Sequence, residues 1–433
     1  MDARLGPGQL FAYGLFGMPL AMAALPLYVH LPKFYGDELG MSLALVGGIL
    51  LGARLLDALQ DPLLGYLSDR APGRKRFVLA ALPLLAAGML GLFNPPALAA
   101  GALALWLLAC LALVYLGFSM ASISYQAWGA QLSSDRNERT RITASRETFT
   151  LIGVVAAAAL PALLGSGGAE QLSRFALLFV LLLAACGALT LTLSPEVPAP
   201  PRAAGGLFAA LMQPLGNPAF RSLLLVFVLN GIASAIPATL VLFFMSDVLQ
   251  LGERSGLFLA LYFVSGAAGM PLWVALARRY GKRAAWICAM LLSVAAFVWA
   301  YGLGAGDAAA YAAVCVLSGV ALGADLALPP SLLADVMDED VNAAAARSEG
   351  AYFGVWNLVT KLNLALAAGI SLPLLGALGY APGAAGASGG GAALSFVYCL
   401  VPCALKLAAA AALWVMPPGA GPVPSFTPSG NHP

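Results

Sequence analysis

Charged residues are scarce in this sequence of 433 residues. Asp, Glu, Lys and Arg make up 10% of the chain, hydrophobic residues make up 61%, and the mean hydropathy is +0.87. A typical soluble domain contains about 25% charged residues. The chain lacks the polar surface that a large soluble enzyme needs, and its hydrophobicity excludes an intrinsically disordered scaffold. The composition is that of a protein that crosses a lipid bilayer many times.

The motifs of most enzymes are missing as well. The sequence has only two histidines, His30 and His432, which are too few to favour a Ser-His-Asp site. It contains no GxxxxGK phosphate loop, no HExxH and no CxxC. The six cysteines lie in apolar stretches, so we interpret them as small packing residues. A net charge of +2 gives no reason to expect a nucleic-acid partner. We therefore expect no enzyme activity and no cofactor.

Long hydrophobic stretches, in contrast, are abundant. A helix of about 20 apolar residues spans the hydrocarbon core of a bilayer. Stretches of this kind occur at residues 9–33, 42–68, 77–95, 101–130, 145–166, 173–194, 221–247, 254–280, 285–304, 309–335, 348–378 and 392–416. The sequence therefore predicts an all-α integral membrane protein with twelve transmembrane helices.

A segment rich in Pro, Ala and Gly divides these stretches into two halves. Residues 196–220 are typical of a linker, or of a linker plus a short surface helix. The motif GYLSDRAPGRKR after the second stretch is weakly repeated as ALARRYGKRA after the eighth. A repeated unit of six helices is typical of a transporter built from two bundles around a central cavity. We expect bundles at 1–195 and 221–416, with a disordered tail at 417–433.

The basic residues indicate the orientation. If the amino terminus is inside, the inner surface carries sixteen of the 22 Lys and Arg residues, namely Arg4, Arg70, Arg74, Lys75, Arg76, Arg136, Arg139, Arg141, Arg146, Arg202, Arg221, Arg278, Arg279, Lys282, Arg283 and Arg347. The outer loops carry three. This asymmetry follows the positive-inside rule. We expect both termini in the cytoplasm and the protein in a bacterial-type inner (plasma) membrane.

Three charged residues lie close together within the second stretch, which reads GARLLDALQDPLLGYLSDR. Asp57 and Asp61 are four residues apart and Arg54 precedes Asp57 by three, so all three share one helix face. Each ionised group at mid-bilayer costs on the order of 3 kcal/mol. Two carboxylates one turn apart repel each other unless a cation lies between them or one is protonated.

With Gln60 as a source of a neutral oxygen, this cluster predicts one of two sites. It is either a cage for a small hard cation or a proton-titrating pair of carboxylates. The alternative is a structural salt-bridge cluster of the two acids with Arg54. The functional interpretation is favoured, because a structural pair would not need two acids and an arginine within the bilayer.

Three more charges lie within the later stretches. Lys361 is alone in its predicted helix, so it needs an anion, which Asp57, Asp61, Asp325 or the substrate could supply. Asp325 is interpreted either as a coupling residue or as the buried partner of Lys361 or Lys406. Lys406 could instead extend along its stem to the inner surface.

Aromatic and amide side chains supply candidates for the wall of a cavity. These candidates are Tyr28, Tyr125, Gln126, Trp128, Trp356 and Asn357. Ordinary helix packing is the alternative role for each of them taken singly. As a group near the intramembrane charges, they predict contacts with a substrate.

Four segments resemble one family of transporters. RLLDALQDPLLGYLSDR followed by GRKR resembles the signature of the glycoside-pentoside-hexuronide:cation symporters, the melibiose-permease branch of the major facilitator superfamily. SSDRNERTRITASRETF is similar to that family's loop before the fifth span. SLLADVMDEDV and RSEGAYFGVWNLVTKLNLALAAG resemble its tenth and eleventh spans. The resemblance covers most of the chain in register and implies the major facilitator fold.

The resemblance also implies roles for particular residues. Asp57 and Asp61 match the paired acids of the family's cation site, which accepts sodium or a proton, and Gln60 and Ser119 match its neutral ligands. Lys361 matches the lysine beside that site. On the same basis, Arg146 matches a cavity arginine, and Trp356 and Asn357 occupy positions on the sugar side.

Two positions depart from the family pattern. Melibiose permease grips sugar hydroxyls with an acid in its first span and another in its fourth, where this sequence has Pro19 and Ser122. An unpaired buried polar group costs about 1–3 kcal/mol, so hydroxyl-rich sugars need such acceptors. The resemblance therefore supports the cation site more strongly than a galactoside site.

These observations predict a cation-coupled secondary transporter that moves a small organic solute by alternating access, with a glycoside or sugar-like molecule as one candidate. The coupling ion would be sodium or a proton. The alternative on the same fold is a proton-driven exporter, or a transporter of a lipid or another amphipathic molecule. A receptor or assembly protein without transport is a weaker alternative, because the chain has no sizeable soluble domain. We expect a monomer whose partners are a small-molecule substrate and the lipid bilayer.

Overall fold

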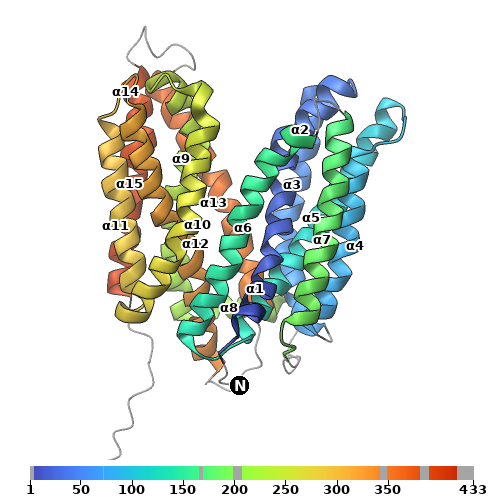
Figure 1. Cartoon of the computed structure of the whole chain (residues 1–433), viewed down its shortest axis with the longest axis horizontal. Coiled ribbons are helices and arrows are strands. Elements are labelled where there is room, and N and C mark those ends of the chain that lie inside the picture. Colours follow the sequence, from blue (N-terminus) through green and yellow to red (C-terminus); the bar gives the residue numbers. More distant parts are fainter. Residues whose placement is uncertain are drawn as a thin grey trace, which may run out of the picture.

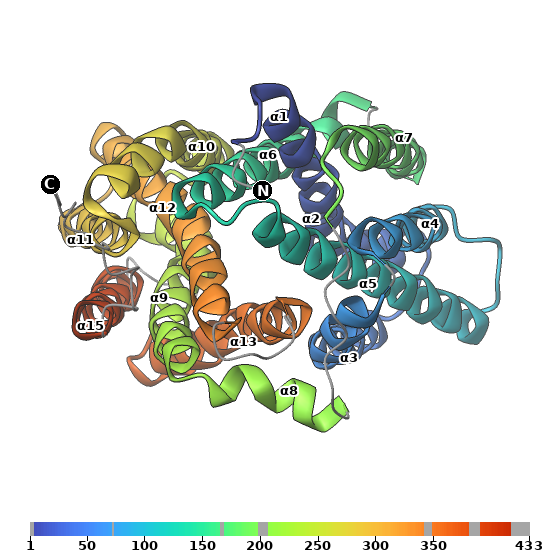
Figure 2. The ribbon, with the colours of Figure 1, turned by 90° about the horizontal axis from the view of Figure 1, so that it is seen from below.

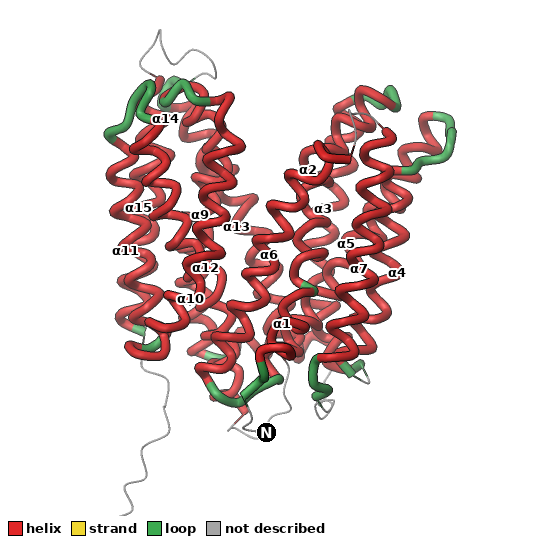
Figure 3. Tube along the Cα trace, in the orientation of Figure 1, coloured by secondary structure: helices red, strands yellow, loops and turns green. Residues whose placement is uncertain are grey.

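The computed structural model of the chain is all-helical. It describes residues 4–71, 73–164, 169–197, 207–341, 349–380 and 390–416, so the predicted tail at 417–433 lies outside the described residues. Helices are the only regular secondary structure in the part of the chain that the structure describes (Figure 3). This confirms the predicted all-α class.

The first helices pack into one bundle, called here the N-terminal bundle. It consists of α1 (Pro7–Leu15), α2 (Gly17–Lys33), α3 (Leu43–Arg70), α4 (Arg74–Phe93), α5 (Ala100–Gln131), α6 (Arg136–Leu164) and α7 (Ala169–Leu193), with a π-helical segment at Phe34–Glu38 after α2. Its core contains the buried rings of Tyr13, Phe16 and Tyr125. The centroid of the Tyr125 ring lies 4.6 Å from that of Tyr13 and 5.2 Å from that of Phe16. The core joins α1, α4, α5 and α7.

The later helices pack into a second bundle, the C-terminal bundle. It consists of α9 (Pro218–Phe243), α10 (Ser255–Tyr280), α11 (Lys282–Tyr301), α12 (Ala308–Val341), α13 (Glu349–Ala377), α14 (Gly390–Ser395) and α15 (Val401–Val415), with π-helical segments at Phe244–Val248 and Phe396–Leu400 and a 3-10 turn at Gly252–Arg254. The short helix α8 (Leu207–Gly216) precedes α9, within the segment for which a linker, or a linker plus a short surface helix, was expected.

Local sequence explains several helix boundaries. The side chain of Ser42 accepts a hydrogen bond from the Leu45 amide and caps α3. Asn217 caps α9 in the same way, and Pro218 occupies its first turn, where a missing N–H costs nothing. The first predicted stretch is divided into α1 and α2 at Phe16. Pro62 lies within a continuous α3.

The two bundles stand side by side and converge at one end (Figure 1). They meet through α3 with α13, α5 with α13, and α6 with α10 and α12. Toward the opposite end the ribbons diverge, and the described amino-terminal residues lie at the converging end (Figures 1 and 2). The converging end is called here the closed end.

Among the described residues, nine helices are long and apolar enough to cross a membrane. In the most apolar stretch of each of these helices, only 25–56% of the residues are buried inside the protein, so the remaining surface is available to lipid. Leu105, Leu181 and Leu257, for example, are 59–68% exposed. Helices α2, α3 and α6 are not among the nine. The chain is therefore an integral membrane protein.

Candidate ion-coupling site

The centre of the candidate site is an ion triad of one lysine and two aspartates. Lys361 on α13 places its Nζ 2.7 Å from Asp57 Oδ2 and 2.8 Å from Asp61 Oδ2, both on α3. The helical repeat puts the two aspartates on one face of α3, and the contact between α3 and α13 brings the lysine to that face. The structure thus resolves the alternatives for the partner of Lys361: it is the aspartate pair and not Asp325.

Neutral groups surround the triad. Ser119 on α5 donates from its hydroxyl to Asp57 Oδ1 at 3.0 Å, and its oxygen accepts from Lys361 Nζ at 3.2 Å. Lys361 also donates to the backbone carbonyl of Asp57 at 3.3 Å. Gln60 donates its amide N–H to Asp57 Oδ1 at 3.1 Å, so in this state its side chain acts as a donor and not as the oxygen ligand expected.

The triad is withdrawn from solvent. Asp61 is 0% exposed and Asp57 is 5% exposed, whereas the Lys361 side chain is 17% exposed. Asp61 Oδ2 is paired with the lysine ammonium, whereas Oδ1 has no hydrogen-bond partner within the described residues. A buried carboxylate oxygen without a partner carries a desolvation penalty that a bound cation or proton would remove.

The donor set suits a hard monovalent cation or a proton. Two carboxylates, the hydroxyl of Ser119 and the carbonyl of Asp57 are all oxygen ligands, which is the chemistry that hard cations prefer. No group of three or more His, Cys, Asp and Glu residues that could hold a metal occurs in the described ranges.

Glycines allow the two helices of the triad to approach closely. A Cβ at Gly354 would lie 2.7 Å from the backbone oxygen of Asp61, and a Cβ at Gly65 would lie 2.1 Å from the backbone oxygen of Gly350. Any larger residue would force α3 and α13 apart. The glycines therefore permit the close contact between α3 and α13 that brings Lys361 to the aspartates.

A second ionic cluster joins the same two helices at the closed end. Asp69, near the end of α3, accepts hydrogen bonds from the amides of Gly350 and Ala351 at 2.7 and 2.9 Å, and so caps the start of α13. Arg74 lies 2.6 Å from Asp69 and 3.4 Å from Glu349. These contacts are called here the α3–α13 lock, and all three charged side chains are buried.

A comparable cluster joins α6 to α12. Arg139 lies 2.5 Å from Asp338 and 3.7 Å from Asp335, and it donates to the carbonyl of Ala334 at 3.2 Å. Lys282 at the start of α11 lies 2.6 Å from Asp335. Both bundles are thus held together by buried ionic contacts at the closed end. Neither of these two ionic clusters was predicted, although the segments that resemble the symporter family contain most of their residues.

The structure places Arg146 beside an unexpected partner. Its guanidinium donates to Glu147 Oε1 at 2.8 and 2.5 Å, so a neighbouring carboxylate pairs with the predicted cavity arginine. Arg146 and Gln126 both line a small cavity of about 10 Å³ between the bundles, together with Tyr13, Pro330 and Phe353 among others. A cavity of this volume holds about one water molecule and is too small for an organic substrate in this state.

The remaining predicted substrate residues have mixed surroundings. Trp356 is 3% exposed and stacks on Phe227 of α9, with ring centroids 3.7 Å apart. Asn357 is half-buried and precedes Lys361 by four residues, so it lies on the same face of α13. Ser122 is buried, and its hydroxyl points to the carbonyl of Ser119 on its own helix at 3.5 Å.

Two of the other predicted residues lie in the core of the N-terminal bundle. Tyr125 and Trp128, candidates for the cavity wall, are 1% exposed and belong to the core of the N-terminal bundle. Arg54 lies on α3 and is half-buried. The side chain of Tyr28 lies outside the described part of the chain.

Asp325 belongs to a separate buried pair within the C-terminal bundle. Its Oδ2 lies 2.8 Å from Lys406 Nζ, and its Oδ1 accepts from Trp286 Nε1 at 2.8 Å and from Asn230 Nδ2 at 3.1 Å. Lys406 is 4% exposed, so the prediction that it could extend to the inner surface is wrong. The α9, α11, α12 and α15 helices share this pair, which satisfies both charges inside one bundle.

Two helical bundles joined by buried ionic contacts, with charges at their interface and lipid-accessible outer surfaces, define a membrane transporter. A sequence model of the family described as "MFS/sugar transport protein" matches residues 10–418. The chain belongs to this family, and it is a secondary transporter of the major facilitator superfamily. This confirms the resemblance to the glycoside and cation symporters.

Individual relatives and solved structures agree with this assignment. The sphingosine-1-phosphate transporter MFSD2B of Mus musculus is 25% identical over 86% of this chain and 81% of its own. The putative glycoside/cation symporter YagG of Escherichia coli is 31% identical over 35% of this chain and 34% of its own. The crystal structure of the Escherichia coli fucose:proton symporter superposes with a TM-score of 0.69 at 12% identity, covering 95% of this chain and 98% of that one.

Proposed function

We propose that the protein is a cation-coupled symporter in which one sodium ion or one proton binds at Asp57 and Asp61 and drives uptake of a small organic solute. The observation that carries this proposal is the ion triad, in which Lys361 Nζ lies 2.7 and 2.8 Å from the two carboxylates. The buried Oδ1 of Asp61 lacks a hydrogen-bond partner among the described residues, which supports a cation or proton at that position.

The charge of the triad favours a monovalent coupling ion. Two ionised aspartates and one ammonium leave a net charge of −1 at a buried position. One proton on Asp61, or one sodium ion beside both aspartates, would bring the site to neutrality. A neutral site costs less to move through a low-dielectric interior than a charged one, so binding of the ion favours the conformational change.

The triad and the α3–α13 lock lie on the same pair of helices, and this links ion binding to gating. Asp61 and Asp69 are eight residues apart on α3, which corresponds to about 12 Å along the helix axis. A cation at the aspartates competes with the Lys361 ammonium and weakens one of the contacts between α3 and α13. Opening of the closed end then requires the α3–α13 lock and the contacts of Arg139 with α12 to separate.

The topology belongs to the same proposal. Helices α2, α3 and α6 pack among the nine apolar helices and complete twelve spans, in bundles at 1–195 and 221–416 joined by the linker 196–220. The positive-inside asymmetry puts both termini in the cytoplasm of a bacterial-type inner membrane. In that orientation the closed end faces the cytoplasm, and the bundles diverge toward the outside. We expect the protein to act as a monomer.

Two substrate classes fit the family. Its sugar transporters favour a glycoside or another sugar-like solute. A lipid or another amphipathic solute, carried by uptake or by proton-driven export, is favoured by a specific observation. The positions of the two sugar-gripping acids hold Pro19 and Ser122, and MFSD2B, named as a sphingosine-1-phosphate transporter, is similar over 86% of this chain.

A ligand screen tests the substrate class and the coupling ion together. The purified protein is heated with sugars, glycosides, organic acids and lysolipids, each with sodium or choline and at two pH values. A solute that binds the folded state raises the melting temperature by mass action. The proposal predicts a hit whose effect depends on sodium or on pH. Flux of that solute in right-side-out and inside-out vesicles then distinguishes uptake from export, and solute binding without flux in either would contradict transport.

A further inference from the structure

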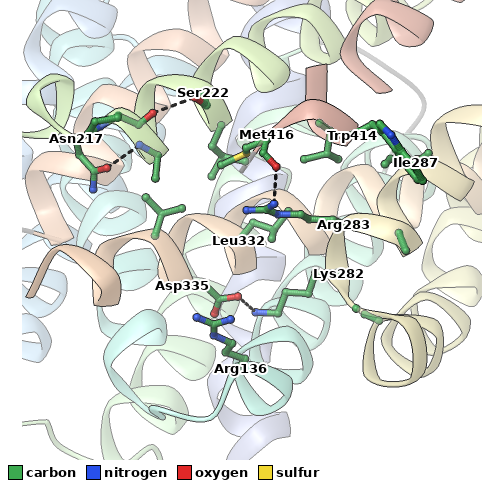
Figure 4. A pocket seen from close by; sticks show the side chains of 18 of the residues that line it. Arg136, Asn217, Ser222, Lys282, Arg283, Ile287, Leu332, Asp335, Trp414 and Met416 are labelled. Atoms are coloured by element: carbon green, nitrogen blue, oxygen red, sulfur yellow. Dashed lines mark hydrogen bonds and ion pairs between the residues drawn. The ribbon is translucent and has the colours of Figure 1, made fainter. Parts of the chain in front are cut away.

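A second cavity lies at the closed end, on the side of the C-terminal bundle. Its volume is about 1220 Å³, and it is formed where the starts of α6, α9 and α11 meet the ends of α10 and α15 and one side of α12 (Figure 4). None of the triad residues lines it. The cavity is called here the basic pocket.

The basic pocket carries an excess of positive charge. Four cationic side chains line it, at Arg136, Arg278, Lys282 and Arg283, whereas Asp335 is the one carboxylate among the described lining residues. Asp335 already pairs with Lys282 at 2.6 Å (Figure 4). Arg283 donates to the carbonyl of Met416 at 2.9 Å through one of its nitrogens, so the rest of its guanidinium stays available. The pocket is therefore suited to an anion.

The start of α11 adds to this field. Gly281 precedes the helix with a φ of 87°, a conformation that glycine adopts without strain, and it supplies no side chain to cap the first amides. Gly281, Lys282, Arg283 and Ala284 all line the pocket. The positive end of the dipole of this helix of 20 residues thus faces the same space as the guanidinium groups.

The other side of the pocket is apolar and faces lipid. Trp414 is 80% exposed and Tyr280 is 62% exposed, and both line the pocket, as does the apolar Ile287 beside Trp414 (Figure 4). Val415, next to Trp414, is 78% exposed. Exposed Trp and Tyr at the end of a transmembrane helix are typical of the headgroup level of a bilayer.

We propose that the basic pocket binds the phosphate headgroup of an anionic phospholipid, with the acyl chains passing beside Trp414 and Ile287. Basic pockets between helix ends on the cytoplasmic side have the chemistry that recognises such headgroups. The inference rests on the proposed orientation of the chain. It requires neither the coupling ion nor the substrate of the proposed function.

The position of the pocket gives the lipid a role in gating. Arg136 comes from α6 of the N-terminal bundle, whereas Lys282 and Arg283 come from α11 of the C-terminal bundle. A phosphate held by both sides links the two bundles at the closed end. The lipid therefore favours the conformation in which the cytoplasmic side is closed.

Lipid binding by the purified, detergent-solubilised protein tests the proposal. Phosphatidylglycerol is titrated in native mass spectrometry, with phosphatidylcholine as the zwitterionic comparison and glycerol 3-phosphate as the soluble phosphate. The test variant is Arg278→Gln/Arg283→Gln. The matched control is Arg279→Gln, because Arg279 is adjacent on α10, lies over the Tyr280 ring and is not among the pocket's lining residues.

The proposal predicts selective binding of phosphatidylglycerol by the unchanged protein. The double variant loses about thirtyfold in apparent affinity, because each basic side chain near a bilayer contributes about 1 kcal/mol, and the Arg279→Gln control is unchanged. If the double variant does not fold, the single variant Arg278→Gln gives the same comparison at about fivefold. Equal binding of phosphatidylcholine, tighter binding of glycerol 3-phosphate than of the lipid, or full retention of affinity by the variant would overturn it. These outcomes measure lipid binding alone, so they test the lipid proposal whether or not coupled uptake is observed.

Discussion

Lys361 Nζ lies 2.8 Å from Asp61 Oδ2, whereas Oδ1 of this fully buried carboxylate has no hydrogen-bond partner among the described residues. The ammonium also serves Asp57, at 2.7 Å, so one positive charge is divided between two negative ones. A site of this kind is close to neutrality and needs one more monovalent cation to reach it. That relationship underlies the predictions that follow.

Removal of the lysine charge makes stability depend on cations. In Lys361→Ala two buried aspartates face each other without an ammonium, which costs about 3–5 kcal/mol when both are ionised. We expect a lower melting temperature than that of the unchanged protein, with a larger recovery on adding sodium or lowering the pH. The double variant Lys361→Ala/Asp61→Asn should recover most of the loss. A melting temperature of Lys361→Ala that is insensitive to both sodium and pH would contradict the triad's role.

Weakening the α3–α13 lock opens the closed end. Asp69→Asn removes the charge that pairs with Arg74 and that caps the start of α13, at a cost of about 1–3 kcal/mol. We expect a shift of the conformational equilibrium toward the state open at that end, by about five- to 150-fold. Spin labels placed on α6 and α12 at the closed end report the shift as longer distances.

Asp307→Asn is the matched control for that measurement. Asp307 also accepts a hydrogen bond from a backbone amide, that of Gly304, but it lies in the loop between α11 and α12 on the other side of the molecule. Its variant should keep the short distances at the closed end. Identical distance distributions for Asp69→Asn and the unchanged protein would show that the lock does not hold this end closed.

A methyl group at Gly354 tests the helix approach. The added carbon would lie 2.7 Å from the Asp61 carbonyl oxygen, so Gly354→Ala forces α13 away from α3. Overpacking of this kind costs about 1–3 kcal/mol. It should lower the thermal stability of the conformation in which the two bundles are in contact at the closed end. Gly369→Ala is the control, because a Cβ there meets nothing within 4 Å. Equal stability of the two variants would contradict the close approach.

The pair of Asp325 and Lys406 is expected to support the fold of the C-terminal bundle. Lys406→Met leaves the buried Asp325 without its cation and should destabilise the protein by about 3–5 kcal/mol, as measured by thermal unfolding. Asp325→Asn/Lys406→Met should restore stability and keep ion-dependent uptake. A stable double variant that has lost ion-dependent uptake would instead place Asp325 in the coupling machinery.

The sequence predicts those parts of the site whose residues all lie on one helix. The spacing of Asp57 and Asp61 and their place in an apolar stretch are enough to put both carboxylates on one face. The positions of the long helices also follow from hydropathy, because apolar runs are what a bilayer requires. The pairing of Lys361 with these aspartates does not follow from helical spacing, since Asp325 and the substrate were also candidate partners. It was implied only by the resemblance to the symporter family.

Contacts between distant segments explain what the sequence did not reveal. The capping of α13 by Asp69 joins residues that are 281 positions apart, and no local periodicity encodes it. The pairing of Arg146 with Glu147 is the opposite case: the two are adjacent, but adjacency does not say that their side chains meet. For Lys406 the sequence left two roles open, as the partner of Asp325 or as a side chain that extends to the inner surface, because Asp325 belongs to another helix of the same bundle.

Gradient-driven uptake by Asp61→Asn in proteoliposomes tests the central claim most directly. Asparagine keeps the shape of the site but removes the charge that the coupling ion neutralises, so the cation gradient can no longer drive the cycle. With the solute found by the ligand screen and an imposed sodium or proton gradient, the unchanged protein should concentrate the solute and Asp61→Asn should only equilibrate it. Concentration of the solute by Asp61→Asn to the level reached by the unchanged protein would contradict the account.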